Sequence, residues 1–248
     1  MRRTVGIIGI EFTDQTFDEA VGELHRSLDG DARRSVFFAN AATLNLAADD
    51  PGYARTLRSG DIVYGDGTGI RWAAKIRGVR LQSNLNGTDM IPELLRRRPG
   101  TRVFLLGGTQ EMIAEAAAGF SASFPEAVLA DAHHGYFDHD RSDAVIERIN
   151  QSNAELLLVG FGNPLQERWI AQHRDRLDVK LAAGVGGLFA YWSGTLTRAP
   201  LWYRNLGIEW VHILKKQPHK ARRYLLGNPL FVYRMMSWLL SDSAGKTA

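Results

Sequence analysis

The sequence contains no cysteine, which excludes disulfide bridges, thiolate metal sites and a cysteine nucleophile. This absence fits a protein of the reducing cytoplasm. The N-terminal region also lacks a long hydrophobic run: the apolar run from Val5 to Ile10 is short and is followed by Glu11. We therefore expect neither a signal peptide nor a transmembrane span in this part of the chain.

Three common signatures of catalysis and nucleotide binding are also absent. No loop fits the dinucleotide pattern G-x-G-x-x-G or the phosphate-loop pattern G-x-x-x-x-G-K-[ST], and no serine stands in a G-x-S-x-G elbow. The sequence therefore does not indicate a dinucleotide enzyme, a P-loop nucleotidase or a serine hydrolase. What it has is a composition that is ordinary for a globular protein, with 45% hydrophobic and 23% charged residues, and several glycine-containing loops.

Those loops belong to a repeated order of strand, loop and helix. Four predicted strands run into glycine-containing loops and then helices, at residues 62–64, 102–106, 156–159 and 179–183. Further strands are predicted at 5–10, 35–39 and 128–130. The order predicts an α/β fold with a Rossmann-like, mostly parallel sheet flanked by helices. The glycine loops would then line one edge of the sheet, as a nucleotide or sugar-phosphate site requires.

The loop Gly65-Asp66-Gly67-Thr68-Gly69 follows the β-branched strand at 62–64. Its glycines let a ligand approach the backbone closely, since no Cβ stands in the way. Asp66 lies just past the carboxyl end of the strand, where open α/β sheets bind ligands. We expect Asp66 to act as a general base that takes a proton from a substrate hydroxyl. The alternative is a tight turn in which Asp66 caps the next helix.

Polar residues on neighbouring loops are further candidates. We expect Asn40, Asn84 and Asn86 to orient substrate hydroxyls through their amides, although each of them also fits an ordinary turn. Gln166 falls in the first turn of a helix after a glycine loop, where its amide and the backbone N–H groups could face a diphosphate. A group of histidines and aspartates at 133–140 matches no metal-binding spacing, so we expect no metal and no cofactor.

The C-terminal segment differs in charge from the rest. From Leu196 onward nine Lys and Arg residues stand against two acidic ones, a charge of +7, while the whole chain carries +3. Large aromatic residues are interleaved with these cations, which favours either a membrane surface or nucleic acid, and a packed helical subdomain with a solvated basic face is the alternative. The apolar stretch from Leu225 to Leu240 is interrupted by Asn228, Pro229 and Arg234, so we expect it to lie on a membrane without crossing it.

Nine short blocks in this order and spacing resemble the WecG/TagA/CpsF glycosyltransferase family over nearly the whole chain. They are NAATLN (40–45), GDGTG (65–69), NLNGTD (84–89), FLLGG (104–108), GYF (135–137), VGFGNPLQERWI (159–170), GVGG (184–187), RAPLW (198–202) and EW (209–210). The resemblance implies an inverting, metal-independent transferase. Such an enzyme moves a hexose, an N-acetylhexosamine or an N-acetylhexosaminuronic acid from a UDP-sugar to a saccharide carried on undecaprenyl diphosphate, for a cell-surface polymer.

The resemblance also assigns roles by position. Asp66 matches the general base, Asn40 an asparagine near the reacting sugar, and Gln166 a glutamine of the nucleotide-sugar site. The expected domains are an α/β catalytic domain at 1–195 and a basic appendage at 196–248 that docks on the inner face of the cell membrane. Arginines of the appendage would face the diphosphate. The substrate-binding residues that we expect are Thr43, Gly67, Asn84, Asn86, Gly107, Gly108, Phe137, Gly160, Gln166, Gly184, Gly186, Arg198, Arg222 and Arg223.

Three departures from the family pattern leave the sugar open. Phe38 stands where many members have threonine, so nearby Thr43 is the alternative source of that hydroxyl. Asn84 replaces an arginine, and Ala190 replaces a frequent aspartate. The competing interpretation of the whole chain is a non-catalytic protein that binds a nucleotide sugar or RNA. No known RNA-binding motif supports it, so we expect no nucleic-acid partner. The oligomeric state is also open, with a homo-oligomer as one alternative.

Overall fold

The computed structural model describes residues 3–200, 203, 214 and 225–244, and the following description refers to these. Its strands are β1 (Thr4–Ile7), β2 (Ile10–Thr13), β3 (Arg34–Ala39), β4 (Ile62–Gly65), β5 (Arg102–Gly107), β6 (Val128–His133), β7 (Leu156–Gly160) and β8 (Leu181–Gly184). Its α-helices are α1 (Phe17–Asp29), α2 (Ala41–Asp49), α3 (Pro51–Ser59), α4 (Thr68–Ile76), α5 (Gly87–Arg97), α6 (Gln110–Ser123), α7 (Asp143–Gln151), α8 (Leu165–His173), α9 (Leu188–Trp192) and α13 (Gly227–Ala244).

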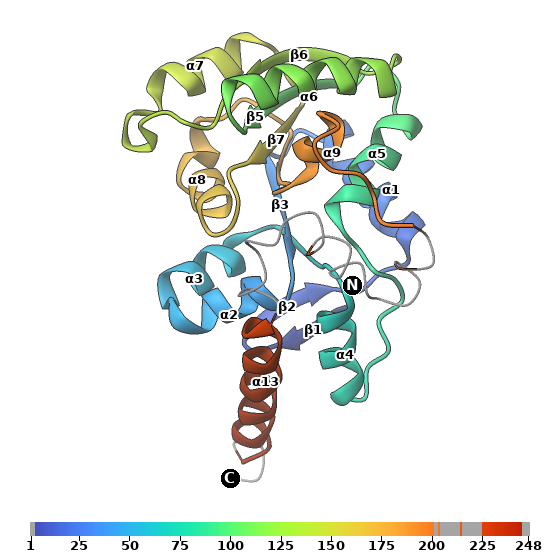
Figure 1. Ribbon diagram of the computed structural model, residues 1–248, viewed down its shortest axis with the longest axis vertical. Helices are drawn as coiled ribbons and strands as arrows, with labels where there is room; N and C mark the ends of the chain where they lie inside the picture. Colours follow the sequence, from blue (N-terminus) through green and yellow to red (C-terminus); the bar gives the residue numbers. More distant parts are fainter. Residues whose placement is uncertain (1–2, 201–202, 204–213, 215–224, 245–248) are drawn as a thin grey trace.

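The eight strands form one sheet in the order β1-β2-β4-β3-β8-β7-β5-β6. Only the β1–β2 pair is antiparallel among these described strands, and the other neighbours pair in parallel. Helices cover both faces of the sheet (Figure 1). This confirms the predicted α/β fold with a mostly parallel sheet.

The sheet separates two hydrophobic clusters because strand side chains alternate between its faces. On β3, Phe37 belongs to the cluster that includes residues of α2, α3, α4, α8 and α13, whereas Phe38 belongs to the cluster that includes residues of α1, α5, α6 and α9. Both central strands β3 and β8 are buried along nearly their whole length. A sheet buried on both faces explains why these strands are almost continuously apolar in sequence.

The N-terminal prediction was wrong in one respect. Residues 5–10 were expected to be one strand, but the chain reverses at Ile8 and Gly9, so that β1 and β2 form a hairpin. Both turn residues have positive φ, 48° and 72°, as a two-residue hairpin turn with right-handed strand twist requires. Ile8 is an unusual residue for that conformation, which is why the sequence did not indicate a turn here.

The parallel arrangement brings the carboxyl ends of β4, β3, β8 and β7 side by side in the sheet. The segments that follow these strands carry Asp66, Asn40, Gly186 and Asn163, respectively. Open α/β sheets bind ligands at this edge. At the other end of the chain, α13 packs on α2 through buried Phe231 and Met235 (Figure 1).

Candidate active site

A cavity of about 520 Å³ opens at this edge of the sheet. Its walls come from the loops after the four strands, from the first turns of α4 and α5, and from the start of α13. Nine of the predicted site residues line it: Asn40, Asp66, Gly67, Asn84, Asn86, Gln166, Gly184, Gly186 and Arg198. The cavity therefore brings together residues that are up to 158 positions apart, between Asn40 and Arg198, in the sequence.

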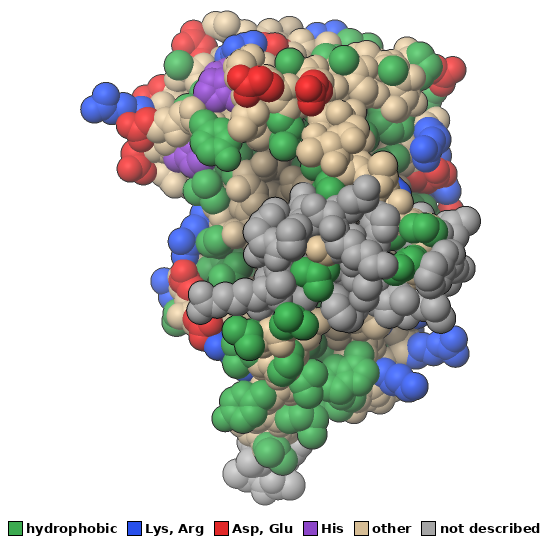
Figure 2. All heavy atoms as spheres, in the orientation of Figure 1, with side chains coloured by type: hydrophobic (Ala, Val, Ile, Leu, Met, Phe, Trp, Pro, Cys, Tyr) green, Lys and Arg blue, Asp and Glu red, His purple; other side chains and the backbone are tan. Residues whose placement is uncertain are grey.

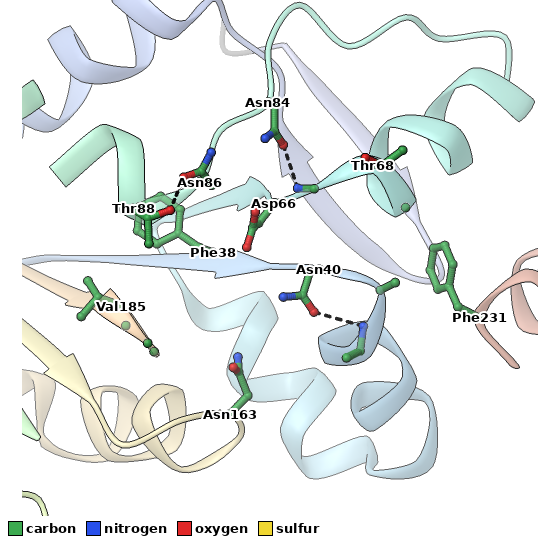
Figure 3. Close-up of a pocket in the computed structure, with 18 of the residues that line it drawn as sticks. Phe38, Asn40, Asp66, Thr68, Asn84, Asn86, Thr88, Asn163, Val185 and Phe231 are labelled. Carbon is green, nitrogen blue, oxygen red and sulfur yellow. Dashed lines mark hydrogen bonds between the residues drawn. The ribbon is translucent and has the colours of Figure 1, made fainter. Parts of the chain in front are cut away.

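Asp66 is half-buried at the centre of this arrangement, and its carboxylate points into the space between Asn40 and the 84–88 segment (Figure 3). Its backbone N–H donates to the carbonyl of Ala39 at 2.9 Å, which ties the β4 loop to the end of β3. The next residue, Gly67, adopts φ of 88°, a conformation that favours glycine. Gly67 and not Asp66 occupies the N-cap position of α4.

The three predicted asparagines hold the backbone of the site. Asn40 is the N-cap of α2, and its Oδ1 accepts from the N–H groups of Ala42 and Thr43. Asn86 is the N-cap of α5, bonding the N–H of Asp89 through Oδ1 at 2.9 Å. The Oδ1 of Asn84 accepts from Gly67 N–H at 2.7 Å and so fixes the glycine loop beside Asp66 (Figure 3). Their expected contacts with substrate hydroxyls stay predictions.

Thr43 does not line the cavity. It is almost completely buried, and its hydroxyl donates to Asn40 Oδ1 at 3.3 Å. Phe38 fills the wall where the family pattern has threonine, packing on Tyr64 with ring centroids 6.0 Å apart. The structure therefore gives Thr43 a place behind Asn40, and the hydroxyl that Phe38 lacks is not supplied to the cavity by Thr43.

Gln166 lies in the first turn of α8 and is buried. Its Oε1 accepts from the N–H of Gly162 at 3.1 Å and of Gly186 at 3.0 Å, so it joins the loops after β7 and β8. Its Nε2 donates to Glu167 at 2.7 Å. Gln166 therefore sets the spacing of two glycine loops that line the cavity.

Arg198 lines the cavity and contacts the first turn of α5, and its expected contact with the diphosphate stays a prediction. Its guanidinium forms an ion pair with Asp89, donates to the Thr88 hydroxyl at 2.7 Å and lies over the Tyr191 ring, 5.4 Å from its centroid. These contacts hold residues 196–200 against the cavity wall. The two other predicted arginines, Arg222 and Arg223, lie outside the described residues.

Four predicted substrate-binding residues are not part of the cavity wall: Gly107, Gly108, Phe137 and Gly160. Gly107, Gly108 and Gly160 lie farther along the same sheet edge, at the ends of β5 and β7, and Phe137 lies in the segment that follows β6. A Cβ on Gly107 would come within 2.6 Å of the Gly160 carbonyl oxygen, so a glycine is needed there for the two strands to lie close together. Phe137 packs against Phe161 and His139.

The nearby histidines make contacts within the protein. His133 Nδ1 lies 2.7 Å from the His134 carbonyl oxygen, and His139 Nε2 lies 2.9 Å from that of Gly135. Burial lowers the pKa of His133. Within the part of the chain that the structure describes, no group of three or more histidine, cysteine, aspartate or glutamate side chains is arranged to hold a metal ion.

Several residues of the cavity were not predicted as site residues. Asn163 projects from the loop after β7 toward Asn40 and Asp66, and Phe231 reaches the cavity from α13 (Figure 3). The buried residue Glu167 lies behind Gln166 and Asn163, bonded to both and to the Tyr53 hydroxyl. Burial raises the pKa of the Glu167 carboxyl group, and burial together with the Glu167 charge raises the pKa of Tyr53.

Comparison with known proteins places this chain in a family. A family model described as the glycosyl transferase WecG/TagA/CpsF family matches residues 5–245. Similar proteins from Staphylococcus aureus strains MW2, NCTC 8325 / PS 47 and COL each bear the name N-acetylglucosaminyldiphosphoundecaprenol N-acetyl-beta-D-mannosaminyltransferase. Each is 28% identical to this chain over 235 residues, which make up 93% of this chain and 91% of the relative.

Proposed function

We propose a specific reaction for this chain, which belongs to the glycosyl transferase WecG/TagA/CpsF family and is a glycosyltransferase. The chain transfers an N-acetylhexosamine from a UDP-sugar to a sugar that is carried on a polyprenyl diphosphate. The names of the Staphylococcus aureus relatives support both the transferred sugar class and the lipid-diphosphate acceptor. The observation that carries the proposal is the Asp66 carboxylate, which faces a cavity built from glycine loops and neutral amides.

Asp66 supplies the base that transfer needs. Its carboxylate takes the proton of the acceptor hydroxyl, and the hydroxyl oxygen attacks the anomeric carbon of the donor sugar. The bond from that carbon to the UDP oxygen breaks, and UDP leaves with the bonding electrons. Because attack and departure occur on opposite faces of the carbon, the sugar is transferred with inversion. The acceptor proton ends on Asp66 and is released to water when the products leave.

The donor diphosphate has two anion-binding features beside it. Helix α4 begins at the cavity wall with Gly67 as its N-cap, so the positive end of its dipole faces the cavity. Arg198 adds a cation to the cavity wall, positioned by Asp89 and Thr88. Arginine binds phosphate oxygens through its planar fork of donors. Together these groups would stabilise the charge that develops on UDP.

The exposed apolar surface of helix α13 is an argument for an acceptor that is held at a membrane. Several of its apolar side chains are exposed, among them Tyr233 at 70% and Leu240 at 74%, and Leu225 and Leu226 lie just before it. Figure 2 shows hydrophobic side chains gathered over this end of the molecule, with Lys and Arg side chains beside them. No helix among the described residues is long and apolar enough to cross a membrane. We propose that α13 lies in the surface of the cytoplasmic leaflet.

The same helix connects that surface to the chemistry. Phe231 lines the cavity and lies next to Gly69 of the Asp66 loop, where an added Cβ would come within 3.6 Å of its ring, while Arg234 pairs with Asp49 of α2. A lipid-linked sugar that enters along α13 would therefore arrive beside Asp66. This arrangement fits an appendage at 196–248 that serves the catalytic domain at 1–195.

The proposal is tested by incubating the full chain with a panel of UDP-sugars and an N-acetylglucosaminyl diphospholipid in vesicles, following UDP release. We expect UDP release from a UDP-N-acetylhexosamine that depends on the acceptor, and a β-linked product from an α-linked donor. Binding of UDP-sugars without acceptor-dependent release from any donor would instead indicate a nucleotide-sugar-binding protein.

A further inference from the structure

A buried carboxylate lies directly behind the cavity wall. The Glu167 side chain is 0% exposed, and three neutral groups donate to it. Its Oε1 accepts from Asn163 Nδ2 at 2.8 Å and Gln166 Nε2 at 2.7 Å, and its Oε2 accepts from the Tyr53 hydroxyl at 3.0 Å. No cationic side chain among the described residues forms an ion pair with it. Burying a carboxyl group in this way is costly unless its hydrogen bonds are satisfied.

Two of the three donors belong to residues that line the cavity. The Gln166 amide is fixed on both sides, since its oxygen faces the N–H groups of Gly162 and Gly186 and its nitrogen faces Glu167. Reversing this amide would place its nitrogen against two N–H donors and its oxygen against the carboxylate. Glu167 therefore dictates the orientation in which Gln166 joins the two glycine loops.

The Asn163 amide is fixed on one side. Its nitrogen donates to Glu167 and also lies 3.3 Å from the Tyr53 hydroxyl and 3.5 Å from that of Thr43. Within the described part of the chain its Oδ1 accepts no hydrogen bond, whereas the side chain points toward Asn40 and Asp66 (Figure 3). Because the amide is planar, committing the nitrogen to the buried carboxylate turns the oxygen away from it, toward the cavity.

We propose that Glu167 is a positioning residue for sugar transfer and that Asn163 is the residue it presents to the substrate. Glu167 holds both amides, so that Gln166 keeps the loops in place while Asn163 Oδ1 accepts a hydrogen bond from a hydroxyl or amide N–H of the bound sugar. A site that bonds a sugar donor group in this way discriminates against sugars that lack it. This inference rests on the proposed function, because it names a substrate contact of the same cavity.

Two substitutions of Glu167 separate positioning from simple stability. Glu167→Gln keeps a carbonyl oxygen for the Asn163 and Gln166 donors, while its new amide nitrogen can donate to the Tyr53 oxygen. Glu167→Ala removes every acceptor and leaves both amides without an anchor. A positioning role therefore predicts rescue by glutamine, whereas a role in stability alone predicts changes in melting temperature without changes in substrate binding.

The kinetic test compares wild type with four variants of the full chain, and each KM is measured with the other substrate at a saturating concentration. We expect Glu167→Ala and Asn163→Ala each to raise the KM for one sugar substrate by about tenfold, the loss of one substrate hydrogen bond, and Glu167→Gln to stay within about threefold of wild type. The double variant Asn163→Ala with Glu167→Ala should raise this KM by less than the product of the two single effects, because both changes remove the Asn163 contact. Unchanged KM values in a folded Asn163→Ala, or additive effects in the double variant, would overturn the inference.

A second measurement does not depend on activity. The NMR signals of the Asn163 and Gln166 side-chain amides can be assigned by their loss in Asn163→Ala and Gln166→Ala. The hydrogens of these amides should exchange with solvent slowly in wild type and Glu167→Gln, and fast in Glu167→Ala. Equal exchange in all forms contradicts the positioning role. If wild type transfers no sugar while the two amides remain protected from exchange, the proposed function is wrong, but the hydrogen bonds from Asn163 and Gln166 to Glu167 are confirmed. If Glu167→Ala does not fold, Asn163→Ala alone decides the substrate contact.

Discussion

Single side chains around the cavity divide between holding the backbone and facing the ligand. Asn40 and Asn86 cap helices, and Asn84 holds the Gly67 loop. The sequence predicted all three as site residues, but residue type and loop position could not separate these uses, because capping depends on backbone geometry. Asp66 was easier to single out, since three glycines and a strand end surround it.

Asn163 and Glu167 were missed for different reasons. Asn163 stands before a proline in a glycine loop, a context in which asparagine is an ordinary turn residue. Glu167 is an acid in the first turn of a helix, which usually means a solvated residue that favours the helix dipole. A signal was present, because Trp169, Ile170 and His173 define the buried face of α8, and helical spacing places Gln166 and Glu167 on that face.

The buried Glu167 should also make folding stability depend on pH. Burial raises its pKa in the folded protein above the value in the unfolded chain, so its favourable contribution is complete below the ordinary glutamate pKa and is lost as pH rises. The Tyr53 hydroxyl donates to this carboxyl, and Arg168 lies over the Tyr53 ring and pairs with Asp50. We expect the free energy of unfolding of Glu167→Gln, relative to wild type, to increase from pH 4 upward.

Glu155 provides a control whose pKa is shifted in the opposite direction. The Arg98 guanidinium lowers the pKa of this carboxyl, so its contribution to stability is present above the ordinary glutamate pKa and is lost as pH falls. Relative to wild type, Glu155→Gln should therefore become less stable as pH rises. Urea denaturation at several pH values measures both differences. Parallel pH profiles for the two variants would show that Glu167 is not a buried acid of raised pKa.

At the scale of elements, two of the predicted strands differ from those in the structure. The β1–β2 turn was missed because Ile8 occupies a backbone conformation that glycine or asparagine normally adopts. Strand β6 continues to His133, beyond the predicted 128–130, because it pairs with β5 along its length. Such pairing comes from a neighbouring strand and cannot be read from local composition.

Helix α13 has one face packed against the protein and another face exposed to solvent. Phe231 and Met235 are buried against α2, whereas Tyr233, Met236 and Leu240 are exposed. Its sequence predicted an apolar stretch that lies on a membrane without crossing it, and the contact with a membrane stays a prediction. Which residues face the protein follows only from the packing of α13 on α2.

The exposed face of α13 leads to a prediction about membrane binding. The double substitution Tyr233→Ser and Leu240→Ser should weaken binding to anionic phospholipid vesicles by at least about tenfold, because each side chain loses apolar area that a bilayer would bury. Melting temperature should change little, since both residues are largely exposed. Vesicle co-sedimentation measures the effect.

The matched control for that experiment is Tyr136→Ser. Tyr136 is 77% exposed and lies in the loop between β6 and α7, elements at the end of the molecule opposite α13 (Figure 1). It should leave vesicle binding unchanged. If the α13 double variant sediments with vesicles as wild type does, α13 is not the membrane-binding surface.

At the scale of the whole molecule, the sheet assembles the site. The alternation of strands and helices predicted the fold class, and the glycine loops predicted that one sheet edge carries the site. The strand order was not predictable, because it depends on long-range contacts that no local pattern records. That order explains why the loops after β4, β3, β8 and β7 line the cavity while the ends of β5 and β6 do not.

The central claim is that this cavity transfers a sugar with Asp66 as the base. The most direct test compares wild type with Asp66→Asn, which keeps the size of the side chain and removes its basicity, in acceptor-dependent UDP release. We expect at least about a hundredfold loss of turnover, with UDP binding by calorimetry and melting temperature close to wild type. Turnover near that of wild type in a folded Asp66→Asn variant would contradict the account.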